Sequence, residues 1–168
     1  MRSFVLISVV TMTLMACSTT TVYIVRHAEK VGEADTADLS PAGKQRALAL
    51  ADVLTNKGID SIFTTPTRRT RQTAEPLSQR ISVPLVEYPA RPNEGIVNRV
   101  RQIQNKTVLV VGHSNTILDI ARGLGTQPTK NTIESGDFDN LFRVRIRRGL
   151  LGESVRLSEA TYGQPTSP

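Results

Sequence analysis

The chain has 168 residues, enough for one domain with a hydrophobic core of its own. It carries 21 basic and 15 acidic residues, a net charge of +6, and the composition of a globular protein rather than a disordered one. The basic excess favours an anionic substrate or an anionic membrane surface as partner. It does not indicate nucleic acid, because the one dense basic cluster, residues 143–148, follows the alternating pattern of a strand with a solvated edge.

The first 16 residues have the pattern of a secretory leader. Residues 1–3 give a short positive start, and residues 4–16 are uncharged and mostly apolar. This apolar segment is shorter than the roughly 20 residues of a transmembrane helix and suits a signal peptide. It ends at Cys17, the one cysteine of the chain.

The residues before Cys17, Leu14-Met15-Ala16, resemble the lipobox of bacterial lipoproteins. The resemblance implies that residues 1–16 are removed and that the Cys17 thiol carries a diacylglycerol. A small buried cysteine or an uncleaved anchor is the alternative. Ser18 in place of Asp implies, by resemblance to Gram-negative lipoproteins, a position on the outer membrane that faces the periplasm.

The next elements are taken in chain order. Residues 18–21 are expected to be a polar tether, and residues 21–25 form a β-branched apolar run typical of a buried strand. Ser40 and Pro41 are typical of a helix start and Gly58 of the turn that follows the helix. Further strands are predicted at residues 59–65, 82–88, 107–111, 141–146 and 154–157, and further helices at residues 67–79, 93–105 and 116–124.

Strands that alternate with helices predict a mostly parallel sheet covered on both faces. The expected fold class is therefore α/β, with three layers, α/β/α. No linker divides residues 17–168, which we expect to form a single domain.

Three basic or imidazole clusters follow separate predicted strands: Arg26 with His27, Arg68 with Arg69, and His113. Ligands of open α/β sheets bind just beyond the carboxyl ends of the strands, so these clusters should converge. Phosphoryl transfer requires such a set, because its transition state spreads negative charge over three oxygens that arginine can bind. Histidine can act as a nucleophile or donor near neutral pH.

Four motifs in this order resemble those of the histidine phosphatase superfamily, the phosphoglycerate-mutase-like group. Its Arg-His-Gly-Glu signature is matched at residues 26–29, with Ala28 in place of glycine. Residues 38–47 resemble its first helix start, and residues 65–74 resemble its Ser-Pro-x-x-Arg-Ala-x-Gln-Thr-Ala segment, with Thr65 and Thr70 as departures. Residues 110–115 match its second histidine motif. The resemblance spans about residues 21–124.

The family implies a phosphatase that needs no cofactor and no metal. His27 would attack phosphorus and become a phosphohistidine, which water would then cleave. Arg26, Arg69 and His113 would bind the phosphoryl oxygens, whereas Arg68 would lie at the rim. Ser114 and Asn115 are candidate substrate-binding residues, although both could simply cap the next helix. Glu29 is expected to orient the loop through hydrogen bonds.

The sequence does not single out one residue as the general acid. Many family members place a carboxylate between the arginine motif and the second histidine, where Glu94 is the first candidate here and Glu87 the second. A helix start favours a carboxylate in any case, so the position alone does not prove a catalytic role. Without an acid, the enzyme would prefer substrates with good leaving groups.

The sequence leaves two functions open. The first is a metal-independent phosphomonoesterase on the periplasmic face of the envelope, anchored by lipid on Cys17 and acting on a phosphorylated small molecule or envelope sugar. The second is a non-catalytic envelope lipoprotein that binds phosphorylated ligands through the same arginines.

Overall fold

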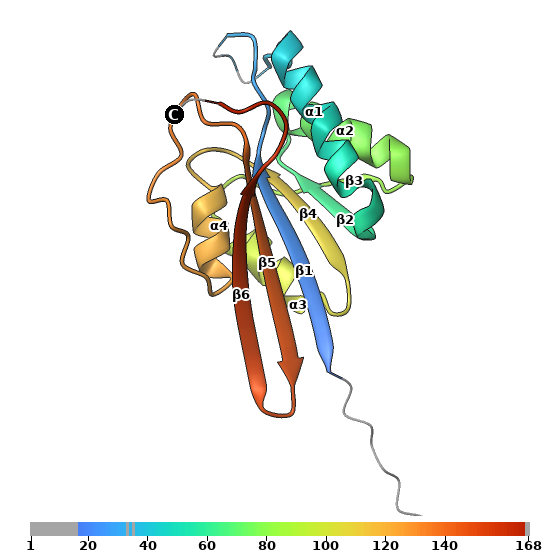
Figure 1. Cartoon of the computed structure of the whole chain (residues 1–168), viewed down its shortest axis with the longest axis vertical. Helices are drawn as coiled ribbons and strands as arrows, with labels where there is room; N and C mark the ends of the chain where they lie inside the picture. Colours follow the sequence, from blue (N-terminus) through green and yellow to red (C-terminus); the bar gives the residue numbers. More distant parts are fainter. Residues whose placement is uncertain (1–16, 33, 35, 167–168) are drawn as a thin grey trace, which may run out of the picture.

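The computed structural model describes residues 17–32, 34 and 36–166. Six strands and four α-helices alternate through most of this part of the chain (Figure 1). The elements are β1 (Ser18–Arg26), α1 (Pro41–Leu54), a short 3-10 turn (Thr55–Lys57), β2 (Ile59–Thr64), α2 (Arg68–Ile81), β3 (Leu85–Glu87), α3 (Glu94–Gln102), β4 (Thr107–Gly112), α4 (Ile117–Gly123), β5 (Asn140–Gly149) and β6 (Gly152–Thr161).

All six strands belong to one sheet with the order β3-β2-β4-β1-β5-β6. The first four strands are parallel to one another, whereas β5 and β6 run antiparallel to their neighbours. The predicted α/β class with a mostly parallel sheet is confirmed. The carboxyl ends of β1, β2 and β4 therefore meet at one edge of the sheet, where parallel sheets bind their ligands.

Helices cover both faces of the sheet, which gives the expected three layers. Helices α1 and α2 pack on one face of the sheet, and α3 and α4 pack on the other. Each pair of helices covers one hydrophobic cluster. Along β1, Val22 and Ile24 face the α3–α4 side, and Tyr23 and Val25 face the α1–α2 side. A strand buried on both faces reads as a continuous apolar run, which is why this segment could be recognised.

The strand boundaries differ from the prediction in three places. β1 begins at Ser18, so the expected polar tether is part of the sheet, because Ser18 pairs with Arg148 of β5. β3 is only three residues long, and β6 is ten residues long. The basic segment of β5 is not at an edge, since β6 pairs along its whole length.

The predicted leader, residues 1–16, lies outside the described residues, and Cys17 is exposed directly before β1. Within the described residues no helix combines the length and the apolar character that a membrane span requires.

Candidate active site

The pairing of β1 with β4 places the two histidines of the chain side by side. Arg26 is in register with Gly112, and the His27 main-chain N–H donates to the Gly112 carbonyl at 2.9 Å. The centroids of the two imidazole rings, His27 and His113, are 5.4 Å apart. The structure thus brings together the residues that the two histidine motifs predicted.

The imidazole of His27 is held in one tautomer. Its Nδ1 lies 2.8 Å from the carbonyl oxygen of Ala28, which can only accept, so Nδ1 carries the proton and Nε2 keeps its lone pair. The side chain is buried, with only 4% of its surface exposed. Burial lowers the pKa of His27 from 6.5 to about 3, and the positive charge of Arg26 adds to this effect. His27 is therefore neutral at ordinary pH, and its Nε2 has a lone pair that could act as a nucleophile.

Arg26 forms a buried wall of the same pocket. Its Nη1 contacts the carbonyl oxygens of Glu134, Ser135 and Asp137 at 2.8–3.0 Å. The guanidinium stacks on the ring of Phe138, with Cζ 3.9 Å from the ring centroid. The loop before β5 thus fixes the position of this cation beside His27.

His113 bonds to groups on α2 and on the loop that precedes it. Arg69 Nη2 lies 3.5 Å from His113 Nδ1, and Thr65 Oγ1 lies 3.0 Å from His113 Nε2. Because a guanidinium only donates, Nδ1 accepts and the neutral ring carries its proton on Nε2, directed at Thr65. Arg69 is thereby oriented into the pocket.

Thr65 belongs to a cluster of threonine hydroxyl groups. Its Oγ1 lies 3.2 Å from Thr67 Oγ1 and 3.0 Å from Thr70 Oγ1, and Thr70 Oγ1 donates to the Thr65 and Thr67 carbonyls. Thr65 and Thr70 are the two positions where residues 65–74 depart from the family segment that they resemble. The departures form a hydrogen-bonded chain that supports His113.

Of the two arginines at the start of α2, one lies in the pocket and one outside it, as expected. Arg69 lines the pocket that contains both histidines, whereas Arg68 is exposed and pairs with Asp38 at 2.9 Å. Successive helical residues point about 100° apart, so only one member of the pair can face the site.

Helix α2 also holds the loop that follows His27. Thr73 Oγ1 accepts from the Ala28 N–H at 2.9 Å and donates to the Arg69 carbonyl at 2.7 Å. Gln72 accepts from the Leu39 N–H and donates to Asp38 Oδ1. The Gln-Thr pair of the motif at residues 65–74 therefore positions backbone rather than substrate.

Glu29 forms hydrogen bonds that orient the loop, as the sequence suggested. Its partner, Arg46, was not predicted. Both carboxylate oxygens of Glu29 accept from Arg46 at 2.8–3.0 Å, and Arg46 also donates to the Tyr162 and Gln164 carbonyls. The start of α1 lies directly on this loop, since a Cβ at Gly43 would come within 2.0 Å of the Glu29 carbonyl oxygen. Only glycine allows such close approach.

The helix after His113 begins within one residue of the predicted position. α4 starts at Ile117, and the His113 main-chain N–H donates to Thr116 Oγ1 at 3.0 Å. A Cβ at Gly112 would lie 2.9 Å from that same oxygen and 3.2 Å from the Tyr88 hydroxyl. The packing of neighbouring side chains therefore requires glycine at position 112.

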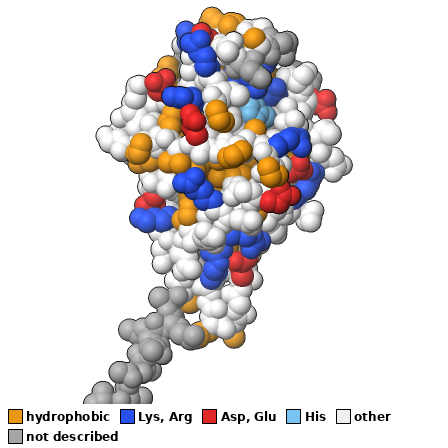
Figure 2. Space-filling model, turned by 180° about the vertical axis from the view of Figure 1, so that it is seen from behind, with side chains coloured by type: hydrophobic (Ala, Val, Ile, Leu, Met, Phe, Trp, Pro, Cys, Tyr) orange, Lys and Arg blue, Asp and Glu red, His pale blue; other side chains and the backbone are white. Residues whose placement is uncertain are grey.

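These residues line one pocket, at the end of the molecule where a histidine is visible from behind (Figure 2). Four cationic side chains and two imidazoles line it, and no carboxylate is among its described lining residues. Ser114 and Asn115 line it as predicted. Within the described residues no group of histidine, cysteine and carboxylate side chains could hold a metal ion. The lining residues are Arg26, His27, Lys30, Thr67, Arg69, Ala90, Arg91, His113, Ser114, Asn115, Thr116 and Ser135.

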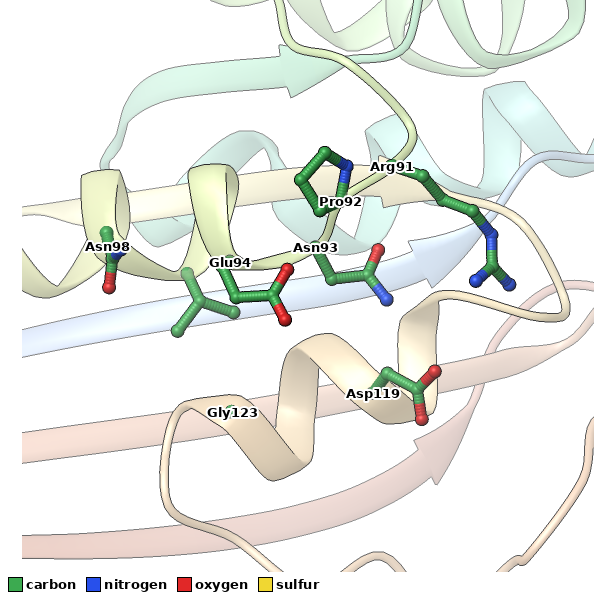
Figure 3. Close-up of a pocket in the computed structure, with 8 residues that line it drawn as sticks. Arg91, Pro92, Asn93, Glu94, Asn98, Asp119 and Gly123 are labelled. Atoms are coloured by element: carbon green, nitrogen blue, oxygen red, sulfur yellow. The ribbon is translucent and has the colours of Figure 1, made fainter.

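The structure does not bring Glu94 into this pocket. Glu94 is exposed at the start of α3 and lines a neighbouring pocket between α3 and α4, with Asp119 and Gly123 on the opposite side (Figure 3). Arg91 is shared by the two pockets. The geometry corrects the placement expected for Glu94, whose position at a helix start is explained by the helix dipole. Glu87 is paired with Arg71 at 3.0 Å and is also absent from the pocket lining.

Sequence reasoning missed several residues that build the site. Lys30 and Arg91 line the pocket from loops, and Phe138 and Arg46 fix the Arg26 and Glu29 side chains. Arg91, Arg46 and Phe138 contact partners far along the chain, so no local pattern marked them. The one available signal was the position of Lys30, three residues after His27.

A buried neutral imidazole surrounded by cations can attack an electrophile that carries negative charge. Guanidinium groups match the oxygens of a phosphoryl group in bidentate fashion. The pocket is therefore suited to binding a phosphate monoester and transferring its phosphoryl group to His27 Nε2.

A family model matches part of the chain. The model of the Histidine phosphatase superfamily (branch 1) matches residues 22–90, which contain His27 and Arg69. No curated protein matches the sequence.

Solved structures share the fold at low sequence identity. Mycobacterial hydrolase 1 is 15% identical with a TM-score of 0.65, covering 82% of this chain and 96% of that chain. The mycobacterial glucosyl-3-phosphoglycerate phosphatase is 14% identical with a TM-score of 0.63, covering 86% and 100%. A protein described as the phosphohistidine phosphatase SixA of Agrobacterium tumefaciens is 17% identical with a TM-score of 0.60, covering 85% and 97%. At such identities the likeness shows the fold alone.

Proposed function

We propose that this chain, which carries the Histidine phosphatase superfamily (branch 1) match and shares the fold of solved histidine phosphatases, hydrolyses phosphomonoesters through a phosphohistidine on His27. The observation that carries the proposal is the tautomer of His27. Its Nδ1 bonds to the Ala28 carbonyl, so the Nε2 lone pair is available to phosphorus in a pocket lined by cations.

The first half-reaction transfers the phosphoryl group to the enzyme. His27 Nε2 forms a bond to phosphorus as the bond between phosphorus and the ester oxygen breaks, and the alkoxide or phenolate leaves and takes a proton from solvent water. Arg26 and Arg69 stabilise the charge on the phosphoryl oxygens. His113 holds the Arg69 guanidinium in the pocket through Nδ1, while its Nε2 keeps the bond to Thr65.

The second half-reaction returns the enzyme to its starting state. Water attacks the phosphohistidine, the bond between Nε2 and phosphorus breaks, and inorganic phosphate leaves. Neutral His27 is regenerated, and no metal takes part in either step.

The favoured substrates are phosphomonoesters whose leaving groups have a low pKa. Among the described residues that line the pocket there is no carboxylate to protonate a departing alkoxide. An aryl phosphate or a phosphorylated nitrogen requires less help from a general acid than an alkyl phosphate does.

Hydrolysis of an aryl and an alkyl phosphate by the purified full chain tests this function. We expect the aryl phosphate to be hydrolysed faster, at a rate that a chelator does not change. His27→Ala should reduce that rate by at least about 10³-fold, as removal of a nucleophile does. Unchanged hydrolysis in His27→Ala would overturn the proposal.

We also propose that Cys17 is lipidated and that the domain faces the periplasm from the outer membrane. The support is the lipobox-like segment that ends at Cys17, together with the exposure of this side chain. Mass spectrometry of the membrane fraction should find a diacylglyceryl-modified amino terminus at Cys17. An unmodified full-length amino terminus would contradict it.

A further inference from the structure

The turn between β5 and β6 exposes two leucines. Leu150 and Leu151 are 73% and 106% exposed, more than any other large hydrophobic side chain among the described residues. Hydrophobic side chains are visible at this lower end of the molecule, far from the histidine near the top (Figure 2). Apolar groups at the tip of a protruding hairpin have no role in the core, so they indicate a contact outside the chain.

The hairpin that carries this turn also presents arginines on one face. Arg143, Arg145 and Arg147 alternate with buried residues along β5, and Arg156 of β6 lies directly opposite Arg145. Side chains alternate along a strand, so these four lie on the same face, which we call the arginine face. α1 and α2 lie over the upper part of the sheet and leave the lower hairpin uncovered (Figure 1).

The charges of the arginine face are not neutralised within the described part of the chain. All four side chains are exposed, and none of them forms an ion pair with a described carboxylate. Arg143 contacts only a hydroxyl, Ser158 Oγ, at 3.3 Å. Like charges directly opposite on a sheet, such as Arg145 and Arg156, weaken the pairing. An anionic surface would relieve this repulsion.

We propose that the Leu150–Leu151 turn and the arginine face together form a docking surface for an anionic lipid bilayer. Apolar side chains at the tip can enter the acyl boundary while arginines bind the headgroup phosphates. A nucleic acid would match the arginines but would leave the two leucines in water. Lipid therefore accounts for both observations.

The chain enters the domain at the same end. Cys17 lines the same surface hollow as Leu150 and Leu151, immediately before β1. Docking through the hairpin is consistent with a lipid on Cys17 but does not depend on it, because the leucines and arginines belong to β5 and β6.

Docking in this way orients the active site. β1 runs nine residues from this end to Arg26, a distance of roughly 30 Å at the rise of an extended strand. The pocket of His27 therefore stays away from the bilayer surface and open to the aqueous phase, where it takes dissolved substrates.

A polarity-sensitive fluorophore at position 150 tests the insertion of the turn. In the full chain, Cys17→Ser removes the one native cysteine and Leu150→Cys gives a single labelling site. We expect a blue shift on vesicles with phosphatidylglycerol and none on phosphatidylcholine vesicles. A label at Leu48→Cys, on α1, should not respond to either vesicle. A label at position 150 that stays in water on both would overturn the proposal.

The affinity of the protein for vesicles tests the role of the arginine charges. The leader is common to all variants of the full chain, so the informative quantity is the ratio of affinities for anionic and neutral vesicles. Each arginine at an anionic surface strengthens binding by about fivefold, so Arg145→Gln with Arg156→Gln should lower this ratio by roughly 25-fold. The matched control, Lys44→Gln with Lys57→Gln, should change it by less than about twofold, because it removes two exposed charges elsewhere.

Two other readouts complete the test. Wild-type binding to anionic vesicles should weaken as salt rises, a result that needs no variant. Equal ratios in the arginine variant and the lysine control would overturn the proposal. Binding of duplex DNA that is lost in the arginine variant, without any response to vesicles, would overturn it as well.

Discussion

His27 and His113 lie on neighbouring strand ends with ring centroids 5.4 Å apart, and their rings are held by different kinds of partner. His27 donates to a main-chain carbonyl, whereas His113 lies between the Thr65 hydroxyl and the Arg69 guanidinium. The first arrangement preserves a lone pair for attack, and the second holds the cationic Arg69 side chain in the pocket. The two imidazoles therefore have separate roles in the proposed reaction.

Arg69 and Arg68 offer a matched pair of variants. Arg69→Ala should reduce kcat/KM for an aryl phosphate by about 10²-fold or more, because it removes a cation that binds the transferred group. Arg68→Ala should change it by less than about threefold, because its exposed pair with Asp38 is outside the pocket. Steady-state kinetics checks both values. Equal losses in the two variants would contradict the assignment of Arg69.

Thr65 is expected to position His113. Thr65→Val leaves the Nε2 donor of His113 without its acceptor and should lower kcat/KM about tenfold, while Thr65→Ser should restore it. Thr64→Val is the control, because the buried Thr64 hydroxyl has no hydrogen-bond partner among the described residues. That change should leave kcat/KM as it is and leave thermal stability equal or higher. Full activity in Thr65→Val would exclude the positioning role.

The contact between Arg46 and Glu29 predicts a large effect on stability. Arg46→Met leaves a poorly solvated carboxylate and should lower the free energy of unfolding by about 3 kcal/mol, measured by urea denaturation. Arg80→Met breaks an exposed pair with Asp52 and should cost less than about 1 kcal/mol. A cost below about 1 kcal/mol for Arg46→Met would show that the contact does not hold the loop.

The lowered pKa of His27 predicts how stability depends on pH. Between the unfolded pKa of 6.5 and the folded pKa of about 3, the unfolded state binds a proton that the folded state does not. The free energy of unfolding should therefore fall as pH decreases through this window, by up to roughly 1.4 kcal/mol per pH unit from His27. In His27→Gln this contribution should disappear. Identical slopes in both proteins, measured by denaturation between pH 4 and 7, would contradict the burial of a neutral imidazole.

Local patterns in the sequence predicted much of the fold and the residues at the centre of the site. The apolar runs that end at His27 and His113 predicted two strands, and the order of strands and helices predicted a parallel sheet that brings those ends together. The register of the family motif, three residues before Gln72, also distinguished Arg69 from Arg68.

The parts that sequence did not predict depend on contacts between distant segments. Phe138 stacks on Arg26 from more than 100 residues away, and Arg46 links Glu29 to the Tyr162 carbonyl near the end of the chain, so neither contact leaves a local pattern. Ser18 was assigned to a tether because its partner strand, β5, lies more than 100 residues away. Glu94 was expected in the site from its position between motifs, but the direction of a helix and its packing decide where the first side chain points.

The most direct test of the account is the detection of the phosphoryl group on His27. The full chain, mixed with an aryl phosphate and quenched rapidly in alkali, should yield an alkali-stable, acid-labile phosphoryl group on the peptide that contains His27. His27→Ala should yield none, and the His113 peptide should stay unmodified in both. Product formation with no phosphoryl group on His27 would contradict the covalent mechanism, and phosphate binding without turnover would leave only a ligand-binding role.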